Sequence, residues 1–458
     1  MGIEYLGLSS INGPLVILEG VQDAFFDEIV EFMVDGKTKK IGRIIELYED
    51  KAVIQVFEGT ENMSLDNTRT KLTGHPMEVS LAPDMLGRTF NGIGKPIDGL
   101  GPLITDVKRD VNGLPLNPVR RKYPRNYIRT GISAIDGLTT LIRGQKLPIF
   151  SGNGLPHDQL AAQIVKQASL GDGSDEPFAV VFGAMGVKHD VADFFQKTFE
   201  ESGVADHVCM FLNLANDPVV ERLITPKVAL TAAEYLAFDC NMHILVILTD
   251  MTSFAEAMRE VSSSKGEIPS RKGYPGYLYS ELATLYERAG IIEGAEGSVT
   301  QLPILTMPND DITHPIPDLT GYITEGQIIL SRDLYRKGIT PPIDVLPSLS
   351  RLKDKGIGPD RTRKDHAATM NQLFAAYARG KDARELMIIL GEAALTDMDK
   401  KYAEFAEAFE REYVSQGYDA NRSIEETLDI GWKLLHILPR SELKRIKDDM
   451  LDEFYGKE

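Results

Sequence analysis

The chain has 458 residues and a formal charge of −18 at pH 7, because 68 acidic residues outnumber 50 basic ones. At roughly 150 residues per domain, this length corresponds to about three domains. A surface this acidic repels phosphate backbones and anionic lipid, which argues against a nucleic-acid binder and against a polybasic membrane anchor. The longest aliphatic run, Ile244 to Leu248, is too short to cross a bilayer. We therefore expect any membrane role to come through partner proteins.

Residues 1–75 are predicted to form a small β-barrel. Short runs of alternating or β-branched residues are separated by turn sequences, among them Asn12-Gly13-Pro14 and Asp35-Gly36. The runs are residues 15–18, 29–34, 41–48 and 52–57. So many short strands in so little chain favour a closed or Greek-key barrel.

Residues 76–350 are predicted to form a central α/β domain, whose first part is a loop-rich stretch with frequent Pro and Gly. Apolar strand-like runs then alternate with stretches of helical periodicity, such as Leu160, Ile164 and Ala168. The runs are residues 147–150, 178–182, 208–212 and 244–248. This alternation favours a parallel sheet covered by helices on both faces. The two cysteines, Cys209 and Cys240, are expected to remain reduced thiols.

Residues 351–458 are predicted to be helical. One helical face comprises Ala367, Met370, Phe374 and Tyr377, and we expect Gly380 to end that helix. A second stripe comprises Met398, Tyr402, Phe405 and Phe409. Ser423 and Glu426 match a capping box, which opens a third helix that stops before Pro439. Its inward face comprises Ile424, Leu428, Trp432 and Leu435. We interpret these stripes as ordinary core.

A phosphate-binding loop of the form G-x-x-x-x-G-K-[ST] does not occur in the sequence. Residues 147–162 nevertheless read as strand, turn and helix start, the context in which loop amides and a helix N-terminus hold phosphates. Aligned by spacing, the loop positions are Ser151, Gly152, Asn153, Gly154, Leu155, Pro156, His157 and Asp158. Proline has no N–H, histidine is mostly neutral at pH 7, and the aspartate is negative where an anion would bind. The sequence predicts either a degenerate phosphate loop that binds phosphate poorly or an ordinary corner with Asp158 as the helix cap.

Two further segments bear on a nucleotide site. Asp250 follows a buried-type strand, at the place where nucleotide-binding sheets carry a Mg²⁺-binding carboxylate, although such aspartates also cap helices. Asp35-Gly36-Lys37-Thr38 matches the end of a phosphate loop, but it lies between two strand-like runs and is predicted to be a hairpin turn. No metal site is predicted.

Several long strings make the chain resemble the B subunit of V-type and archaeal-type rotary ATPases over essentially its whole length. They are residues 129–136, 143–152, 213–218, 230–235, 273–279, 318–327 and 346–351. The resemblance implies an N-terminal β-barrel at 1–75, a central RecA-like α/β domain with a degenerate P-loop at 76–350, and a C-terminal helical domain at 351–458.

The resemblance also implies an assembly. Three such chains would alternate with three catalytic A subunits around a central rotor shaft, with peripheral stalk subunits outside. Mg-ATP or Mg-ADP would bind at the interface with the A subunit, and no cofactor would be bound by this chain alone. The complex would couple ATP synthesis or hydrolysis to H⁺ or Na⁺ transport through a membrane sector, with this soluble head on the cytoplasmic face of the membrane.

Two positions define the expected role in catalysis. Val187 stands where the catalytic relatives carry a glutamate that polarises the attacking water, and valine cannot accept a proton. Because the loop lysine is also absent, we expect no hydrolysis by this chain alone. By resemblance, Arg351 is the arginine finger that reaches the partner's nucleotide, a role that contributes roughly 10³–10⁵ to kcat in such enzymes.

Other functions stay open at this stage. The chain could be an independent RecA-like NTPase with a variant phosphate loop, a nucleic-acid motor, or a scaffold that contributes no side chain to chemistry. The basic cluster at residues 120–125 is interpreted as a solvated loop or subunit contact. The aromatic turn at residues 274–277 fits either a subunit interface or a packed turn.

Overall fold

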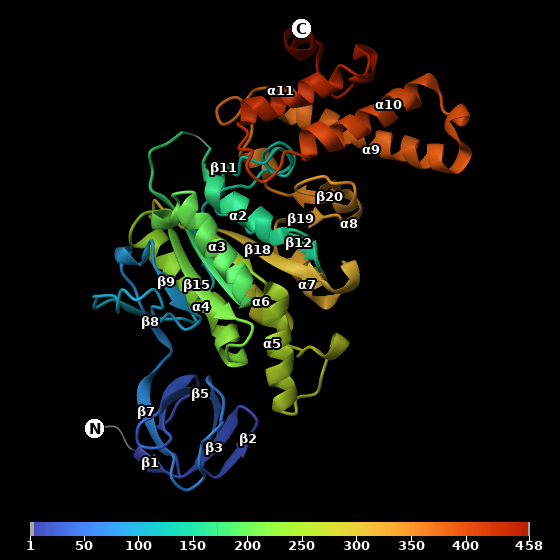
Figure 1. The fold of residues 1–458 in the computed structure, drawn as a ribbon. Helices are drawn as coiled ribbons and strands as arrows, with labels where there is room; N and C mark the ends of the chain where they lie inside the picture. The colour runs from blue at the N-terminus through green and yellow to red at the C-terminus, as the bar shows by residue number, and fades with distance from the viewer. Residues whose placement is uncertain (1–3, 172, 457–458) are drawn as a thin grey trace. The chain divides into compact units, whose positions relative to one another are not determined.

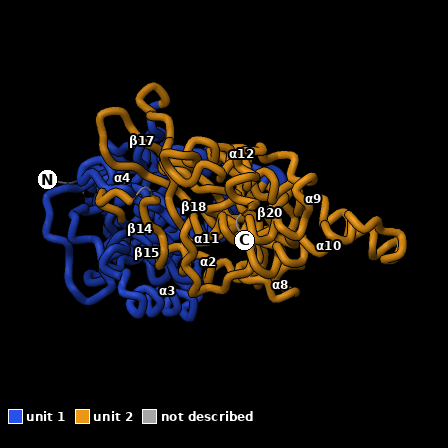
Figure 2. Tube along the Cα trace, turned by 90° about the horizontal axis from the view of Figure 1, so that it is seen from above, with its two compact units in different colours: residues 1–117, 179–288, 318–320 blue, residues 118–178, 289–317, 321–458 orange. Residues whose placement is uncertain are grey.

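The computed structural model describes residues 4–171 and 173–456. The chain divides into two compact units, each assembled from separate stretches of sequence (Figure 2). Unit 1 contains residues up to 117, residues 179–288 and residues 318–320. Unit 2 contains residues 118–178, residues 289–317 and the chain from residue 321 onward. The strands of the central α/β domain are divided between the units, so each unit is described by itself.

The first part of unit 1 is an antiparallel β-barrel (Figure 1). Its strands are β1 (Glu4–Leu6), β2 (Ser10–Asn12), β3 (Leu15–Glu19), β4 (Glu28–Met33), β5 (Lys39–Tyr48), β6 (Lys51–Val56) and β7 (Arg69–Pro76), in the order β1-β7-β4-β5-β6-β3-β2. Val16, Phe32 and Ile44 are completely buried in its core. The four predicted strand runs are confirmed, because alternation places one side of each strand in that core.

The predicted hairpin turn at residues 35–38 is also confirmed. It joins β4 to β5, which pair in antiparallel register. Asp35 Oδ1 accepts hydrogen bonds from the amides of Lys37 and Thr38 at 3.0 and 2.6 Å. An aspartate that bonds the following amides is typical of a tight turn. This Gly-Lys-Thr string is therefore no phosphate loop.

Unit 1 also holds part of the central α/β domain. Its strands are β9 (Thr89–Asn91), β14 (Phe178–Val187), β15 (Val208–Leu214) and β16 (His243–Thr249), in the order β16-β14-β15-β9. A separate pair comprises β8 (Glu78–Ser80) and β10 (Lys108–Asp110). The helices are α3 (His189–Glu201), α4 (Val219–Phe238), α5 (Met251–Ser264) and α6 (Leu278–Tyr286). Strand β15 pairs in parallel with β14, as predicted, and also with β9, which lies in the stretch expected to be loop-rich.

Unit 2 holds the remaining strands of that domain. They are β11 (Ile128–Arg129), β12 (Ile149–Gly152), β13 (Ser169–Leu170), β17 (Gly290–Ile291), β18 (Ser298–Met307), β19 (Gly326–Leu330) and β20 (Ile343–Ser350). Strand β12 is parallel to both β18 and β19. Strand β20 was not among the predicted runs and is antiparallel to β19. The short helices in this region are α1 (Ser133–Asp136), α2 (His157–Gln167), α7 (Pro315–Ile323) and α8 (Arg332–Arg336).

The C-terminal part of unit 2 is helical, as predicted. It comprises α9 (His366–Leu390), α10 (Asp397–Ala408), a π-helical turn (Phe409–Val414), α11 (Ile424–Leu435), α12 (Asp448–Met450) and a second π-helical turn (Leu451–Tyr455). The capping box of α11 is confirmed, since Ser423 Oγ accepts the Glu426 amide at 3.1 Å and Glu426 Oε2 accepts the Ser423 amide at 2.7 Å. Leu428, Trp432 and Leu435 are buried, as their spacing predicted.

Helix α9 differs from the prediction in two respects. It continues past Gly380 to Leu390, because Gly380 is a contact point between helices and not a helix end. A Cβ at Gly380 would collide with the Tyr402 carbonyl oxygen and with Ala406 on α10. The predicted inward face was also wrong in part, because Phe374 is 39% exposed while Leu373 beside it is completely buried.

Within the described part of the chain, no helix is long and apolar enough to span a membrane. Cys209 and Cys240 are both free thiols, as expected.

Candidate functional site

The degenerate loop lies where the sequence placed it, between β12 and α2. Ser151 and Gly152 are buried at the end of β12, and the exposed residues Asn153 and Gly154 form the turn. Helix α2 begins at His157, earlier than predicted, and Pro156 occupies its N-cap position. The reading of Asp158 as the helix cap is therefore wrong, because Asp158 lies inside the first turn.

Hydrogen bonds inside the turn use groups that a phosphate loop would offer to its ligand. The Leu155 amide donates to the Gly152 carbonyl at 3.0 Å, and the His157 amide donates to the Leu155 carbonyl at 2.9 Å. The imidazole of His157 folds back on the strand, with Nδ1 at 3.0 Å from Ser151 Oγ. Proline at position 156 has no N–H at all. The turn therefore presents few amide donors to an anion.

An ion pair that the sequence analysis missed completes the closure of this loop. Arg332 on α8 makes two hydrogen bonds to Asp310, with Nε–Oδ2 and Nη2–Oδ1 distances of 2.6 and 2.8 Å. Arg332 Nη2 also donates to the Asn153 carbonyl at 2.9 Å. The Asp310 carboxylate lies against Gly152, where an added Cβ would collide with it. The hydrogen bonds from Arg332 hold the pKa of Asp310 below its usual range, so the carboxylate is charged at neutral pH.

The closed loop between β12 and α2 disfavours an anion for electrostatic reasons. A phosphate that approached this turn would meet the carboxylate of Asp310 next to Gly152 and that of Asp158 in the first turn of α2. Arg332, which donates to the turn at the Asn153 carbonyl, is already paired with Asp310. The arrangement therefore disfavours an anion at the position where phosphate-binding sheets hold one.

Asp250 and Val187, the other two positions singled out in the sequence, belong to unit 1. Asp250 caps helix α5, because its Oδ1 accepts the Thr252 amide at 2.9 Å. Val187 ends strand β14, and its carbonyl accepts the Ala215 amide at 2.7 Å. The Val187 side chain is buried and apolar, so it offers no group to activate water.

Arg351 directly follows strand β20 in unit 2, and its side chain is exposed. The Arg351 amide donates to the Glu325 carbonyl at 2.9 Å, and the guanidinium donates to the Thr324 carbonyl at 3.4 Å. The preceding residue, Ser350, is buried; its hydroxyl donates to the Thr140 carbonyl and accepts from Gln145 Nε2, both at 3.0 Å. Arg351 is thus an exposed cation. Hydrogen bonds fix its own backbone amide and the preceding residue, Ser350.

The segment that supports Arg351 is fixed by a second set of contacts. Lys146 Nζ lies 3.3 Å from Glu325 Oε1, and the Lys146 amide donates to Glu325 Oε2 at 2.9 Å. Gly326 has a φ of +135°, and a side chain there would collide with the Leu349 carbonyl of β20. Only glycine permits this approach of the two strands. The base of Arg351 is therefore rigid while its guanidinium is accessible.

The aromatic turn at residues 274–277 has one buried and one exposed tyrosine. Tyr274 is 2% exposed and donates a hydrogen bond to Glu256, so it is a packed residue. Tyr277 remains 38% exposed. In the basic cluster, Arg121 donates to the Ala289 carbonyl at 3.0 Å.

Sequence comparison defines the class of protein to which these three domains belong. Residues 8–74 match the β-barrel domain of the ATP synthase alpha/beta family, and residues 131–350 match the nucleotide-binding domain of the same family. Residues 355–455 match the C-terminal domain of V and A type ATP synthase. The barrel, the α/β domain and the helical domain thus form the three-domain chain of an ATP synthase alpha/beta protein.

Individual relatives narrow this class. The V-type ATP synthase beta chain of Halothermothrix orenii is 60% identical over 452 residues, which cover 99% of this chain and 97% of that protein. Among solved structures, the ATP synthase subunit NeqB from Nanoarcheaum equitans shares 41% identity with a TM-score of 0.73, covering 92% of this chain and 98% of that one. The chain therefore belongs to the beta-chain, or B-subunit, family of V/A-type ATP synthases, which are multisubunit ATPase complexes.

Proposed function

We propose that this chain is the non-catalytic, regulatory subunit of its ring and that it donates Arg351 to the ATP site of a neighbouring catalytic A subunit. One contrast within unit 2 supports this proposal. The loop between β12 and α2 is closed by its own bonds and by the Asp310–Arg332 pair, while Arg351 is exposed on a rigid base. A chain with no role in phosphate chemistry would not need an exposed arginine on a rigid backbone.

The proposed chemistry is electrostatic. As the γ-phosphoryl group is transferred, a guanidinium across the interface offsets the charge that spreads over its equatorial oxygens. Arginine suits this role because its planar fork carries two parallel donors, which lysine lacks. Mg-ATP or Mg-ADP would be held mainly by the A subunit, which would also supply the metal ligands and the residue that orients water. This chain alone would then bind no cofactor.

The assembly follows from the same proposal. Three copies of this chain would alternate with three A subunits around a central rotor shaft, with peripheral stalk subunits outside. The complex would couple ATP synthesis or hydrolysis to H⁺ or Na⁺ transport by a membrane sector, from the cytoplasmic face of the membrane. Neither nucleic acid nor lipid would be a direct partner of this acidic chain.

Substitution of Arg351 in a ring reconstituted with the A subunit tests the proposal. We expect Arg351→Ala to leave ring assembly unchanged and to lower ATP turnover by roughly 10³-fold or more, with Arg351→Lys restoring little of it. Arg336→Ala is the matched control, because Arg336 is an exposed arginine on α8 in the same unit, 72% accessible. Unchanged turnover in the Arg351→Ala ring would refute the role. Steady ATP turnover by the purified single chain would favour an independent NTPase instead.

A further inference from the structure

Four Asn-Gly pairs occur in the sequence, at residues 12–13, 91–92, 112–113 and 153–154. Asparagine is a thermolabile residue. In an Asn-Gly pair the glycine nitrogen attacks the carbonyl carbon of the asparagine side chain, and the missing Cβ of glycine leaves this approach open. The attack needs a side chain that is free to rotate and a backbone N–H that is not hydrogen-bonded. The fold therefore determines which of the four pairs reacts.

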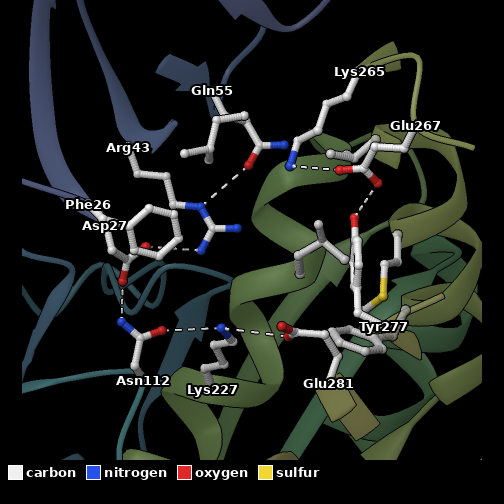
Figure 3. A pocket seen from close by; sticks show the side chains of 15 residues that line it. Phe26, Asp27, Arg43, Gln55, Asn112, Lys227, Lys265, Glu267, Tyr277 and Glu281 are labelled. Atoms are coloured by element: carbon white, nitrogen blue, oxygen red, sulfur yellow. Dashed lines mark hydrogen bonds and ion pairs between the residues drawn. The ribbon is translucent and has the colours of Figure 1, made fainter. Parts of the chain in front are cut away.

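The side chain of Asn112 is held at both of its polar atoms. Its Nδ2 donates to Asp27 Oδ2 and, at 3.0 Å, to Asp110 Oδ1. Its Oδ1 accepts from Lys227 Nζ at 3.2 Å. Figure 3 shows the Asn112 amide between Asp27 and Lys227. Rotation of this side chain would break hydrogen bonds to charged groups, which are stronger than those between neutral groups.

The pair at residues 91–92 is held at the side chain and at the attacking nitrogen. Asn91 Oδ1 accepts the amides of Ile93 and Lys95 at 3.2 and 2.8 Å. The Gly92 amide donates to Glu221 Oε1 at 3.0 Å, and Glu221 is buried. Both requirements of the attack are therefore blocked at this pair.

The pair at residues 12–13 is held at the backbone. Asn12 ends strand β2 and is paired with Leu15 of β3 across the hairpin. Thr60 Oγ1 also donates to the Gly13 carbonyl at 2.6 Å. These bonds restrain the backbone of the pair, although the Asn12 side chain itself is exposed.

Asn153 and Gly154 are restrained least. Both are exposed, in the turn between β12 and α2. Within the described residues, the Asn153 side-chain amide and the Gly154 N–H have no hydrogen-bond partner. A Cβ added at Gly154 would meet no atom within 4 Å, so the space around this residue is open.

Arg332 contacts the peptide group that joins these two residues. Its Nη2 donates to the Asn153 carbonyl oxygen at 2.9 Å. When the Gly154 nitrogen loses its proton, the negative charge is shared with that oxygen. A guanidinium that donates to the oxygen stabilises the charged form, because hydrogen bonds between charged groups are strong. This contact therefore favours formation of the nucleophile at Gly154.

We propose that Asn153 is the preferred site of deamidation in this chain, a modification that is independent of the proposed role of Arg351. The Gly154 nitrogen gives its proton to hydroxide and attacks Asn153 Cγ. The N–Cγ bond forms, the Cγ–Nδ2 bond breaks, and ammonia leaves with a proton from water. Water then opens the cyclic imide at either of its C–N bonds, which gives aspartate or isoaspartate. Each conversion consumes one water and releases one ammonia, without oxidation or reduction.

The modification changes the charge of the degenerate loop. It adds a carboxylate to a turn that already has Asp310 against Gly152 and Asp158 in the first turn of α2. An additional negative charge repels phosphate further. The isoaspartate product also lengthens the backbone by one carbon and is a substrate for enzymes that methylate isoaspartyl carboxylates.

Peptide mapping of the folded full chain, after incubation at mildly alkaline pH and about 37 °C, tests the proposal. Incubation in heavy-oxygen water marks each product, because opening of the imide leaves one solvent oxygen in the new carboxylate. We expect Asn153 to react at least about tenfold faster than Asn91 and Asn112, whose hydrogen bonds must break first. Asn12 should react at an intermediate rate. Equal rates at Asn153 and Asn91 or Asn112 in the folded chain would overturn the proposal.

The same incubation in guanidinium chloride is the control for the fold. In the unfolded chain the restraints are lost, so we expect the four pairs to react at rates within about threefold of one another. A preference for Asn153 that persists there would show that the local sequence is the cause, and would contradict the structural argument.

Substitutions assign the product. Glutamine forms the corresponding larger ring much more slowly, so Asn153→Gln should remove most of the label that an isoaspartyl methyltransferase transfers to the aged chain. Asn12→Gln is the matched control at another exposed Asn-Gly pair and should change the label little. Loss of the label in Asn12→Gln and its retention in Asn153→Gln would refute the assignment.

Discussion

At the scale of single residues, the loop between β12 and α2 is altered by its own side chains and closed by two from distant segments. The replacement of the loop lysine by His157 and of the hydroxyl residue by Asp158 is visible in the string itself. The closure by Asp310 and Arg332 is not, because these residues come from distant segments that only the fold brings to Asn153. The position of Arg351 was predicted from the string around it, whereas its function in the ring stays a prediction.

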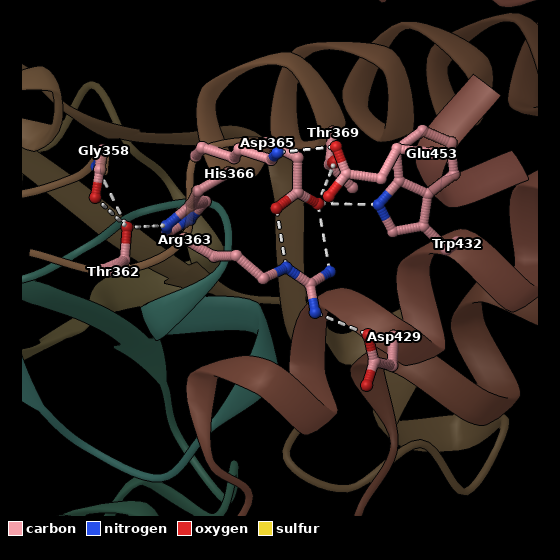
Figure 4. Close-up of polar contacts among 10 residues, drawn as sticks. Gly358, Thr362, Arg363, Asp365, His366, Thr369, Asp429, Trp432 and Glu453 are labelled. Atoms are coloured by element: carbon pink, nitrogen blue, oxygen red, sulfur yellow. Dashed lines mark hydrogen bonds and ion pairs between the residues drawn. The ribbon is translucent and has the colours of Figure 1, made fainter. Parts of the chain in front are cut away.

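An ion pair in the C-terminal helical region contains a completely buried carboxylate, that of Asp365 (Figure 4). Asp365 is completely buried and accepts two hydrogen bonds from Arg363, at 2.6 and 3.0 Å, and one from Trp432 Nε1 at 2.7 Å. Burial acts to raise the pKa of Asp365, but the hydrogen bonds from Arg363 and Trp432 outweigh it and leave the pKa below its usual range. The charged carboxylate is therefore the form that the fold stabilises.

We expect Asp365→Asn to lower the free energy of unfolding at pH 7 by about 1.5–3 kcal/mol, because the amide is uncharged and turns an N–H group toward donors that the buried carboxylate accepts. A lowered pKa stabilises the fold above the ordinary aspartate pKa and loses that effect as the pH falls below it. The difference between the two proteins should therefore narrow below about pH 4. Urea unfolding followed by circular dichroism, at pH 7 and below about pH 4, measures the free energy of unfolding of both proteins.

Asp429→Asn is the matched control for this prediction. Asp429 pairs with the same guanidinium at 2.6 Å, but its side chain is 68% exposed, so its loss should cost less than about 1 kcal/mol. Equal losses for the two variants would show that burial of Asp365 is not the cause.

At the scale of elements, the strands were more predictable than the C-terminal helices. Alternation along β3 to β6 is a local signal, because one face of each strand meets the barrel core. The end of α9 was mispredicted because a glycine usually stops a helix, and only the neighbouring helix α10 explains why Gly380 does not. The exposure of Phe374 was mispredicted for the same reason. The buried face of α9 is determined by the positions at which α10 and α11 pack against it.

Gly380→Ala tests this explanation of α9. In an exposed helix the change would stabilise the protein by about 1 kcal/mol, but here the added methyl group would collide with α10 and cost about 1–3 kcal/mol instead. Gly321→Ala is the control, because Gly321 lies in helix α7 and its added Cβ would meet only Gln327 Oε1 at 3.7 Å. Urea midpoints that rise in both variants would contradict close packing at Gly380.

The C-terminal end of α9 exposes an apolar tip that comprises Leu386, Met387, Ile388, Ile389 and Leu390. Ile388 and Ile389 are 81% and 75% exposed. Contiguous exposed apolar residues mark surfaces that contact other proteins. In the proposed ring, the rotor shaft is the partner that we assign to this tip.

The double substitution Ile388→Glu and Ile389→Glu tests this assignment. It should leave the unfolding midpoint of the chain unchanged, because both side chains are exposed, and it should reduce ATP-driven ion transport by the reconstituted complex more than ATP hydrolysis. Val119→Glu, at another exposed apolar position that is 87% accessible, should change neither activity. Unaltered coupling in the double variant would exclude the tip as a shaft contact.

At the scale of the whole molecule, the family and the three-domain fold are shown by comparison along nearly the full chain. The charge of −18 excluded classes of partner but identified none. Long specific strings identified the family, and some of their residues make buried hydrogen bonds, among them those around Ser350 and Glu325. The central claim concerns the assembly: a chain with its own phosphate loop closed completes the site of its neighbour.

Trapping of Mg-ADP with aluminium fluoride in the reconstituted ring tests that claim most directly, because this complex imitates the phosphoryl group in transfer. An arginine finger acts on that state much more than on bound ADP. We predict that rings with Arg351→Ala bind Mg-ADP with unchanged affinity but fail to trap it with aluminium fluoride, while Arg336→Ala rings trap it fully. Full trapping by Arg351→Ala rings would contradict the account.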